Sequence, residues 1–176
     1  MELHITDRDL LQIDKARITF RNFSGRRDMY NTRGDREFHL VIPNQEIADR
    51  LLANRNRFGV PWNVKIKAPQ HEGENPFIHM KVKLAYKTDA KGRQTGPDIY
   101  LKSGNKTTLL DEEAVSMLDS IDIESVDMDV RPFDGNDGPQ GPYRSAWLSK
   151  MWVTQRLDRF AARFAEEEAP EEDPFY

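Results

Sequence analysis

Hydrophobic and polar residues alternate along several segments of the chain, with the two-residue period of a half-buried β-strand. This pattern predicts strands over Lys15–Phe23, Glu37–Ile42, Trp62–Lys67, Phe77–Leu84, Asp98–Lys102, Val126–Val130 and Tyr143–Thr154. In the first strand, the alternation assigns Phe20 to the core and Arg21 and Phe23 to the exposed face. Core positions predicted in other strands are Phe38, Trp62, Val64 and Leu148.

Two helices and two long loops are predicted between these strands. Gln45–Arg55 has apolar residues at helical spacing, with Asn44 as a plausible N-cap, and a second helix opens at Asp111. Ser24–Asp35 is a basic connector with two glycines, and Asp134–Pro142 reads as a mobile loop. Many strands with short interposed helices and no βαβ rhythm indicate a mainly β protein, either a small antiparallel barrel or a sandwich.

The exposed faces of successive strands combine cations with aromatic rings. Lys and Arg neutralise phosphates, and flat rings stack on unpaired bases, so this pairing is typical of single-stranded nucleic-acid binding. The alternative is that the cations are merely solvated and the rings pack across strands. The candidates are Arg21, Phe23, Lys65, Lys67, Phe77, Lys81, Lys83, Tyr100, Lys102, Lys106, Trp147, Lys150 and Trp152 on the strands, with Arg26, Arg27, Tyr30, Arg33 and Arg36 in or beside the basic loop.

The chain ends in an acidic segment followed by two aromatic residues. Its carboxylates are Glu166, Glu167, Glu168, Glu171, Glu172 and Asp173, and the chain ends on Phe175 and Tyr176. Like charges repel and there is little to bury, so a disordered tail is expected, either solubilising or partner-binding. Without these six acids the net charge changes from −4 to about +2, so the tail could also screen a basic surface of its own chain.

Composition argues against several classes of function. The chain has no cysteine, and its four histidines lack metal-ligand spacing, so we expect no metal and no cofactor. No nucleophile, base and acid converge in the sequence, so an enzyme is not expected. No signal peptide and no membrane-spanning apolar run is recognisable, which favours a cytoplasmic protein with no membrane partner.

Short motifs in a fixed order carry a family resemblance. They are Arg17-Ile-Thr-Phe-Arg-Asn-Phe23, Gly34-Asp-Arg-Glu-Phe38, Trp62-Asn-Val-Lys65, Thr107-Thr-Leu-Leu-Asp111, Val130-Arg-Pro132 and Leu148-Ser-Lys-Met-Trp-Val-Thr154. Over about Lys15 to Phe164 the chain resembles bacteriophage single-stranded DNA-binding proteins. The resemblance implies an OB-fold, a small Greek-key barrel, and a role in phage DNA replication or recombination in the host cytoplasm. It also implies that the acidic tail recruits replication proteins such as a polymerase, helicase or primase.

These inferences divide the chain into four parts: an N-terminal arm (1–14), an OB-fold DNA-binding domain (15–156), a short amphipathic helix (157–165) and a disordered acidic tail (166–176). The leading hypothesis is a non-catalytic protein that coats and protects single-stranded DNA. Duplex DNA and RNA are further candidate ligands, and a protein-interaction barrel of a virion or assembly is the alternative. A long edge strand or an exchanged tail could produce a homo-oligomer.

Overall fold

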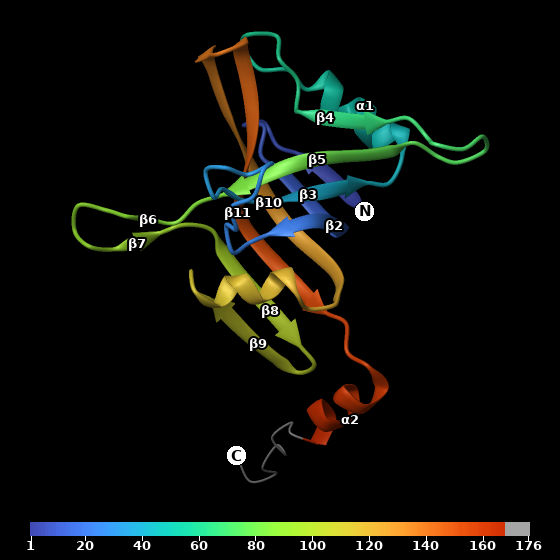
Figure 1. Ribbon diagram of the computed structural model, residues 1–176, viewed down its shortest axis with the longest axis vertical. Coiled ribbons are helices and arrows are strands. Elements are labelled where there is room, and N and C mark those ends of the chain that lie inside the picture. Colours follow the sequence, from blue (N-terminus) through green and yellow to red (C-terminus); the bar gives the residue numbers. More distant parts are fainter. Residues whose placement is uncertain (168–176) are drawn as a thin grey trace.

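The computed structural model describes residues 1–167, so the predictions for Glu168, Glu171, Glu172, Asp173, Phe175 and Tyr176 lie outside the described residues. Strands dominate the fold (Figure 1). They are β1 (Glu2–Ile5), β2 (Leu11–Asn22), β3 (Arg36–Ile42), β4 (Val64–Lys67), β5 (Phe77–Leu84), β6 (Lys87–Thr88), β7 (Gln94–Thr95), β8 (Asp98–Ser103), β9 (Lys106–Leu110), β10 (Ile123–Gly138) and β11 (Gly141–Gln155). The helices are α1 (Gln45–Ala53), the 3₁₀ helix η1 (Ala114–Asp119) and α2 (Arg159–Glu167).

Five of the strands close into a barrel in the order β2, β3, β5, β11, β10 and back to β2. The closure is the parallel contact between β5 and β11, where Lys83 lies opposite Trp147, and the other neighbours are antiparallel. If β2, β3, β5, β10 and β11 are numbered 1 to 5, their order around the barrel is 1-2-3-5-4-1. This is the topology of the five-stranded Greek-key barrel called the OB-fold. The prediction of an OB-fold with short interposed helices is confirmed.

The barrel encloses one hydrophobic core, which includes Phe23, Phe38, Leu40, Met80 and Met151. Helix α1 lies across its upper part and begins where predicted, because the Asn44 side chain accepts a hydrogen bond from the Ile47 backbone N–H. No helix within residues 1–167 is long and apolar enough to cross a membrane.

The N-terminal residues belong to the sheet. β1 pairs with β2 from Glu2–Asp14 to Ile5–Leu11, and Leu3, Leu11 and Ile13 are buried. The N-terminal arm predicted over 1–14 therefore contains β1 and the start of β2. The alternation in 11–14 is too short to distinguish a strand start from a loop, and only the pairing with β1 and β10 reveals it.

Bulges move several residues to the face opposite from the predicted one. Near the end of β2, the pairing with β3 shifts between Thr19 and Asn22, and Phe20 has a left-handed φ of 48°. Phe20 is consequently 63% exposed, whereas Phe23 is buried and stacks on Phe38 with ring centroids 5.3 Å apart. Both predictions, Phe20 in the core and Phe23 on the surface, are wrong because an extra residue reverses the two-residue alternation beyond it.

Other departures have similar local causes. The β10–β11 register skips Ser149, so Leu148 is buried while Trp152 is 37% exposed, although strict alternation would place both on one face. Val64 is half-buried rather than fully in the core, because β4 is an edge strand that pairs only with β5 in the described sheet. The mobile loop predicted over Asp134–Pro142 is instead a continuation of β10 and β11 as a long hairpin.

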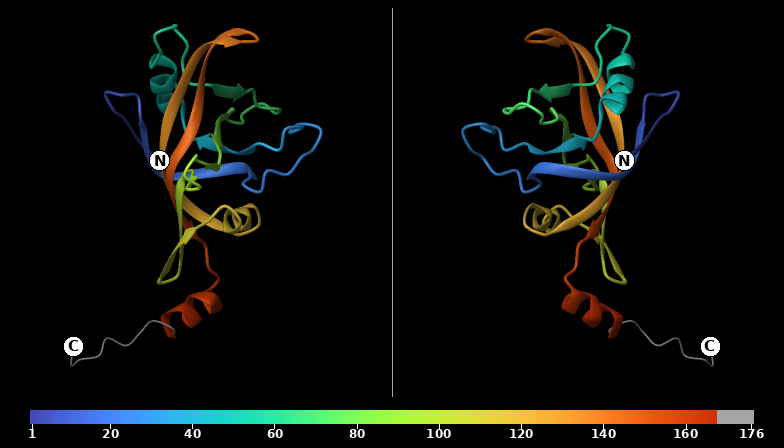
Figure 2. Two further views of the ribbon diagram at one scale, coloured as in Figure 1. Left: turned by 90° about the vertical axis from the view of Figure 1, so that its left-hand side faces the viewer. Right: turned by 90° about the vertical axis from the view of Figure 1, so that its right-hand side faces the viewer.

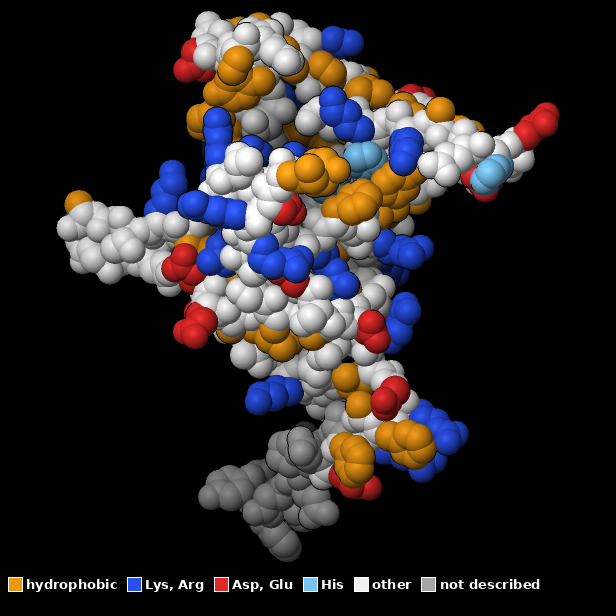
Figure 3. Space-filling model, in the orientation of Figure 1, with side chains coloured by type: hydrophobic (Ala, Val, Ile, Leu, Met, Phe, Trp, Pro, Cys, Tyr) orange, Lys and Arg blue, Asp and Glu red, His pale blue; other side chains and the backbone are white. Residues whose placement is uncertain are grey.

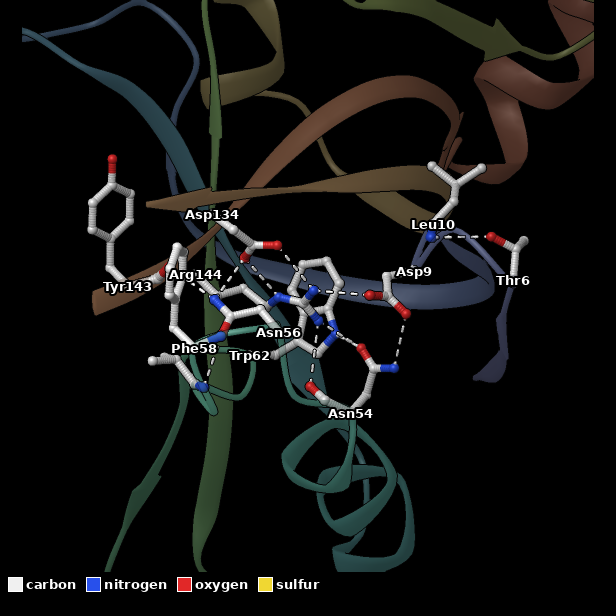
Figure 4. Close-up of polar contacts among 11 residues, drawn as sticks. Thr6, Asp9, Leu10, Asn54, Asn56, Phe58, Trp62, Asp134, Tyr143 and Arg144 are labelled. Atoms are coloured by element: carbon white, nitrogen blue, oxygen red, sulfur yellow. Dashed lines mark hydrogen bonds and ion pairs between the residues drawn. The ribbon is translucent and has the colours of Figure 1, made fainter. Parts of the chain in front are cut away.

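A buried arginine fixes this hairpin to the rest of the molecule (Figure 4). The Arg144 guanidinium, whose side chain is 1% exposed, contacts Asp134 at 2.8 Å and Asp9 at 2.9 Å and donates to the Asn54 side-chain oxygen at 2.7 Å. It also lies 4.9 Å from the centre of the Trp62 ring. The residues come from the β10–β11 hairpin, the β1–β2 turn and the segment after α1, so this charge joins three distant segments of the chain.

Candidate nucleic-acid interface

A cluster of four rings lies on the outer face of β2, β3 and β5. It consists of Phe20, His39, Phe77 and His79, and we call it the ring cluster. The Phe77 and His79 rings are stacked with centroids 4.8 Å apart, and Phe20 meets His39 edge-on at 5.2 Å. Figure 3 shows hydrophobic and histidine side chains grouped on this face with Lys and Arg side chains around them. The rings are exposed or partly exposed to solvent, so they offer surfaces on which bases can stack.

The two histidines share one hydrogen bond. Their Nδ1 atoms are 2.8 Å apart, so one ring must present an unprotonated Nδ1 as the acceptor. Burial, then the neighbouring His79 and Lys81, lower the pKa of His39, and burial, then Lys65 and Lys67, lower the pKa of His79. Both rings therefore favour the neutral state, in which they act as flat stacking surfaces rather than as fixed charges.

Lysines flank the ring cluster on two sides. Lys65 and Lys67 on β4 lie opposite His79 and Phe77, respectively, in the β4–β5 register, and both are exposed. Lys81 lies opposite His39 and forms an ion pair with Glu37 at 3.2 Å. Such partly exposed pairs are weak, so phosphate groups can compete for the lysine at low cost.

The basic loop between β2 and β3 borders the same surface (Figure 2). A hollow of about 380 Å³ lies between it and the ring cluster, lined by Phe20, Arg26, Tyr30, His39 and Lys81 among others. Tyr30 is 91% exposed, yet the loop base is held in place because Asn31 bonds to Arg26 and Asp35. A loop whose base is held in place and whose exposed edge is basic and aromatic is suited to clamp a nucleic-acid strand against the barrel.

The position of this surface within the fold is informative. β3 and β5 are the second and third barrel strands, and the β2–β3 loop joins the first strand to the second. OB-folds hold oligonucleotides on the face of these strands and between this loop and the loop that joins strands four and five. The ring cluster thus lies where an OB-fold binds its ligand.

Comparison with known proteins identifies the family of the chain and gives relatives of its fold. Residues 3–174 match the family described as "Putative phage ssDNA-binding domain". The chain belongs to this family. Two similar solved structures are the single-stranded DNA-binding protein from bacteriophage Enc34 as a C-terminal truncation (TM-score 0.51, 12% identity, 90% of this chain and 91% of that chain covered) and in complex with ssDNA (TM-score 0.50, 12% identity, 90% and 93% covered). At this identity the likeness shows the fold, and a search of curated proteins found no match.

Three residues predicted to bind DNA have side chains that are engaged within the protein itself. Phe23 is buried, as described above. Arg21 donates to the backbone oxygens of Leu118 and Ile121 at 2.8 and 2.7 Å, which holds the end of η1. Arg36 donates to the Phe23 oxygen at 2.7 Å and its side chain is 20% exposed. The sequence pattern could not separate such anchoring arginines from free ones, because their partners lie far away in the chain.

The other predicted residues fall into two groups. The first group lies at or beside the ring cluster and consists of Phe77, Lys65, Lys67, Lys81, Arg26 and Tyr30. Arg27 and Arg33 lie in the same loop, and Arg33 lines a separate hollow with Lys83, the next outward lysine on β5. A second group lies on β8, β9 and β11, where Tyr100 and Trp152 have centroids 5.7 Å apart. Its remaining members are Lys102, Lys106, Lys150 and Trp147.

Sequence reasoning missed Phe20, His39 and His79 as surface rings. For the histidines a usable signal existed, because the alternation itself places His39 beside Glu37, and His79 beside Phe77 and Lys81, on exposed faces. The histidine spacing argues against a metal site, but it leaves open a role as flat rings. For Phe20 there was no comparable signal, because the bulge depends on pairing with β3.

Proposed function

We propose that the protein binds single-stranded DNA across the outer face of β2, β3 and β5, without strong sequence preference. The observation that carries this proposal is the ring cluster with flanking Lys65, Lys67 and Lys81 at the ligand-binding position of an OB-fold. Unpaired bases stack on the rings while the lysines and the β2–β3 loop neutralise phosphates. Family membership and the similar fold of a protein solved with ssDNA support the same ligand.

In this role the protein protects single strands during phage DNA replication or recombination. The acidic tail screens the basic face when no DNA is bound, and it recruits a polymerase, helicase or primase through Phe175 and Tyr176. Support comes from the charge distribution, since the six acids follow a chain whose remainder has about +2. The described part of the tail, Glu166 and Glu167, ends helix α2 with both side chains exposed.

The test is fluorescence anisotropy with labelled single-stranded DNA, duplex DNA and RNA, at two salt concentrations. It compares the full chain with a chain truncated after Ala165. We expect salt-sensitive binding of single strands that tightens on truncation, because the competing carboxylates are removed. Equal affinity of the two chains would contradict the screening role, and absence of single-strand binding in both would contradict the proposed function.

A further inference from the structure

A second aromatic and basic cavity lies apart from the ring cluster. It measures about 470 Å³ and is bordered by the root of the β6–β7 hairpin, which projects from the barrel in Figure 1, and by β10 and β11. Phe133 and Trp147 supply its rings, and Lys87 and Arg131 supply its cations. No acidic residue is among the described residues that line it. A cavity of this size with rings and positive charge suits a nucleotide.

One ring of the cavity is exposed and the other is half-buried. Phe133 is 52% exposed, and its ring has Tyr143 on one side at 6.3 Å between centroids. Trp147 lies opposite Arg131 in the β10–β11 register, and its indole Nε1 is buried with no hydrogen-bond partner among residues 1–167. Proteins rarely leave such a donor unpaired, and a base carbonyl or a phosphate oxygen can serve as its acceptor once the indole edge turns towards the cavity.

A further hollow adjoins the cavity at Ala85 and Trp147. This hollow measures about 340 Å³ and is lined by basic and aromatic residues, Arg33, Lys83, Tyr86 and Trp147 among them, and by the acids Asp35 and Glu112. Lys83 forms an exposed ion pair with Asp35 at 3.9 Å, which phosphate can displace at low cost. Trp147 therefore borders both spaces, and Lys83 lies opposite it where β5 and β11 close the barrel. Lys81, the preceding outward lysine on β5, already borders the ring cluster. Two outward lysines of β5 thus border the two sets of rings, Lys81 at the ring cluster and Lys83 opposite Trp147.

We propose that this cavity is a second base-binding subsite, in which Phe133 and Trp147 hold an unstacked base of the same DNA strand and Lys87 and Arg131 hold its phosphates. The inference rests on the proposed function and adds the path of the DNA across the barrel. This path runs from β4 and β5 over the β5–β11 closure towards the β10–β11 hairpin. The proposal also predicts that the subsite is filled only by strands long enough to span both sets of rings.

The test measures binding of oligothymidines of about 6 and about 16 nucleotides, within the range that one OB-fold covers. Phe133→Ala should weaken binding of the longer strand by about 5-fold to about 140-fold, the loss expected for one stacked base, and leave the shorter strand unchanged. Phe160→Ala is the matched control, because Phe160 is 54% exposed on α2, outside the cavity. Phe20→Ala should weaken both strands.

A second variant tests the cations independently of the rings. Lys87→Gln with Arg131→Gln should reduce the slope of log K against log salt for the longer strand by about 0.7 per lost phosphate contact. Normal binding of both strands by Phe133→Ala, with Phe20→Ala still defective, would overturn the subsite and leave the proposed function standing. Failure of the unmodified protein to bind either strand would overturn both.

Discussion

At the scale of single residues, backbone conformation decides which rings meet the solvent. Phe20 adopts φ 48°, a left-handed value that costs a non-glycine residue about 1–3 kcal/mol unless the surroundings hold it. The bulge that imposes this conformation directs Phe20 towards His39 and Phe77, and it directs Phe23 into the core against Phe38. Strain of this kind is often found where a side chain serves ligand binding.

The first prediction compares these two phenylalanines, which lie three residues apart. Phe20→Ala should lower the affinity for single-stranded DNA by about 1–3 kcal/mol, because a stacked base loses its ring, while the free energy of unfolding changes little. Phe23→Ala should instead lower the free energy of unfolding by about 3–5 kcal/mol, because it empties a buried site. Anisotropy titrations and urea denaturation separate the two effects. If Phe20→Ala lowered the stability and Phe23→Ala lowered the DNA affinity instead, Phe20 would be the core residue, as simple alternation along β2 predicts.

At the scale of elements, the hairpin of β10 and β11 depends on one buried charge. Arg144 contacts Asp134 within the hairpin and Asp9 in the β1–β2 turn. Burial would raise the pKa of Asp134 and Asp9, but hydrogen bonds and charge attraction from Arg144, together with Asn56 and Asn54, lower both pKa values below their ordinary range. The hairpin carries Phe133, Tyr143 and Trp147, so this network also positions a candidate DNA surface.

The second prediction concerns this network. Arg144→Met should lower the free energy of unfolding by about 3 kcal/mol, the lower end of the cost of breaking a buried ion pair, because Asp9 and Asp134 are 34% and 24% exposed. Since both aspartates have depressed pKa values in the folded state, their contribution is present above the unfolded pKa of about 3.9 and is lost as the pH falls below it. Urea denaturation at several pH values should show this loss in the unmodified protein and not in Arg144→Met. If the stability of Arg144→Met depended on pH as that of the unmodified protein does, Arg144 would not be the cause of the lowered pKa values of Asp9 and Asp134.

At the scale of the whole molecule, charge is distributed unevenly over the chain. Basic side chains border the ring cluster on β4, β5 and the β2–β3 loop, whereas a concentrated acidic segment occupies the C-terminal end of the sequence. A second basic and aromatic group lies on β8, β9 and β11, with Lys102 and Lys106 on the β8–β9 hairpin. The group on β8, β9 and β11 is therefore the alternative to the ring cluster as the main path of bound DNA.

The third prediction distinguishes these surfaces. Lys65→Gln with Lys67→Gln should reduce the slope of log K against log salt for single-stranded DNA by about 1.4, which corresponds to two phosphates at about 0.7 each. Lys102→Gln with Lys106→Gln is the matched control, with two exposed strand lysines removed and the same change in net charge. A reduced slope in the control alone would move the DNA path to β8 and β9.

How far the sequence predicts this protein depends on the range of the interactions involved. The periodicity predicts strands β2, β3, β4, β5, β8, β10 and β11, together with the buried Trp62 and the Asn44 cap of α1. It does not predict β1, β6, β7 and β9, which are short or pair locally. The bulges at Phe20 and Ser149 and the pairing of β1 do not follow from it either, because each depends on a partner strand distant in the sequence.

The sequence by itself determined a mainly β chain with cations and rings on exposed strand faces and a reversal of charge at its C-terminal end, because these are properties of residue type and local spacing. Only the tertiary structure decided which of these residues act together. Barrel closure and register bring Phe20, His39, Phe77 and His79 into one cluster, and they assign Arg21, Arg36 and Arg144 to internal contacts. The physical reason is that a binding surface is made of side chains from several strands, and their alignment is fixed by long-range pairing.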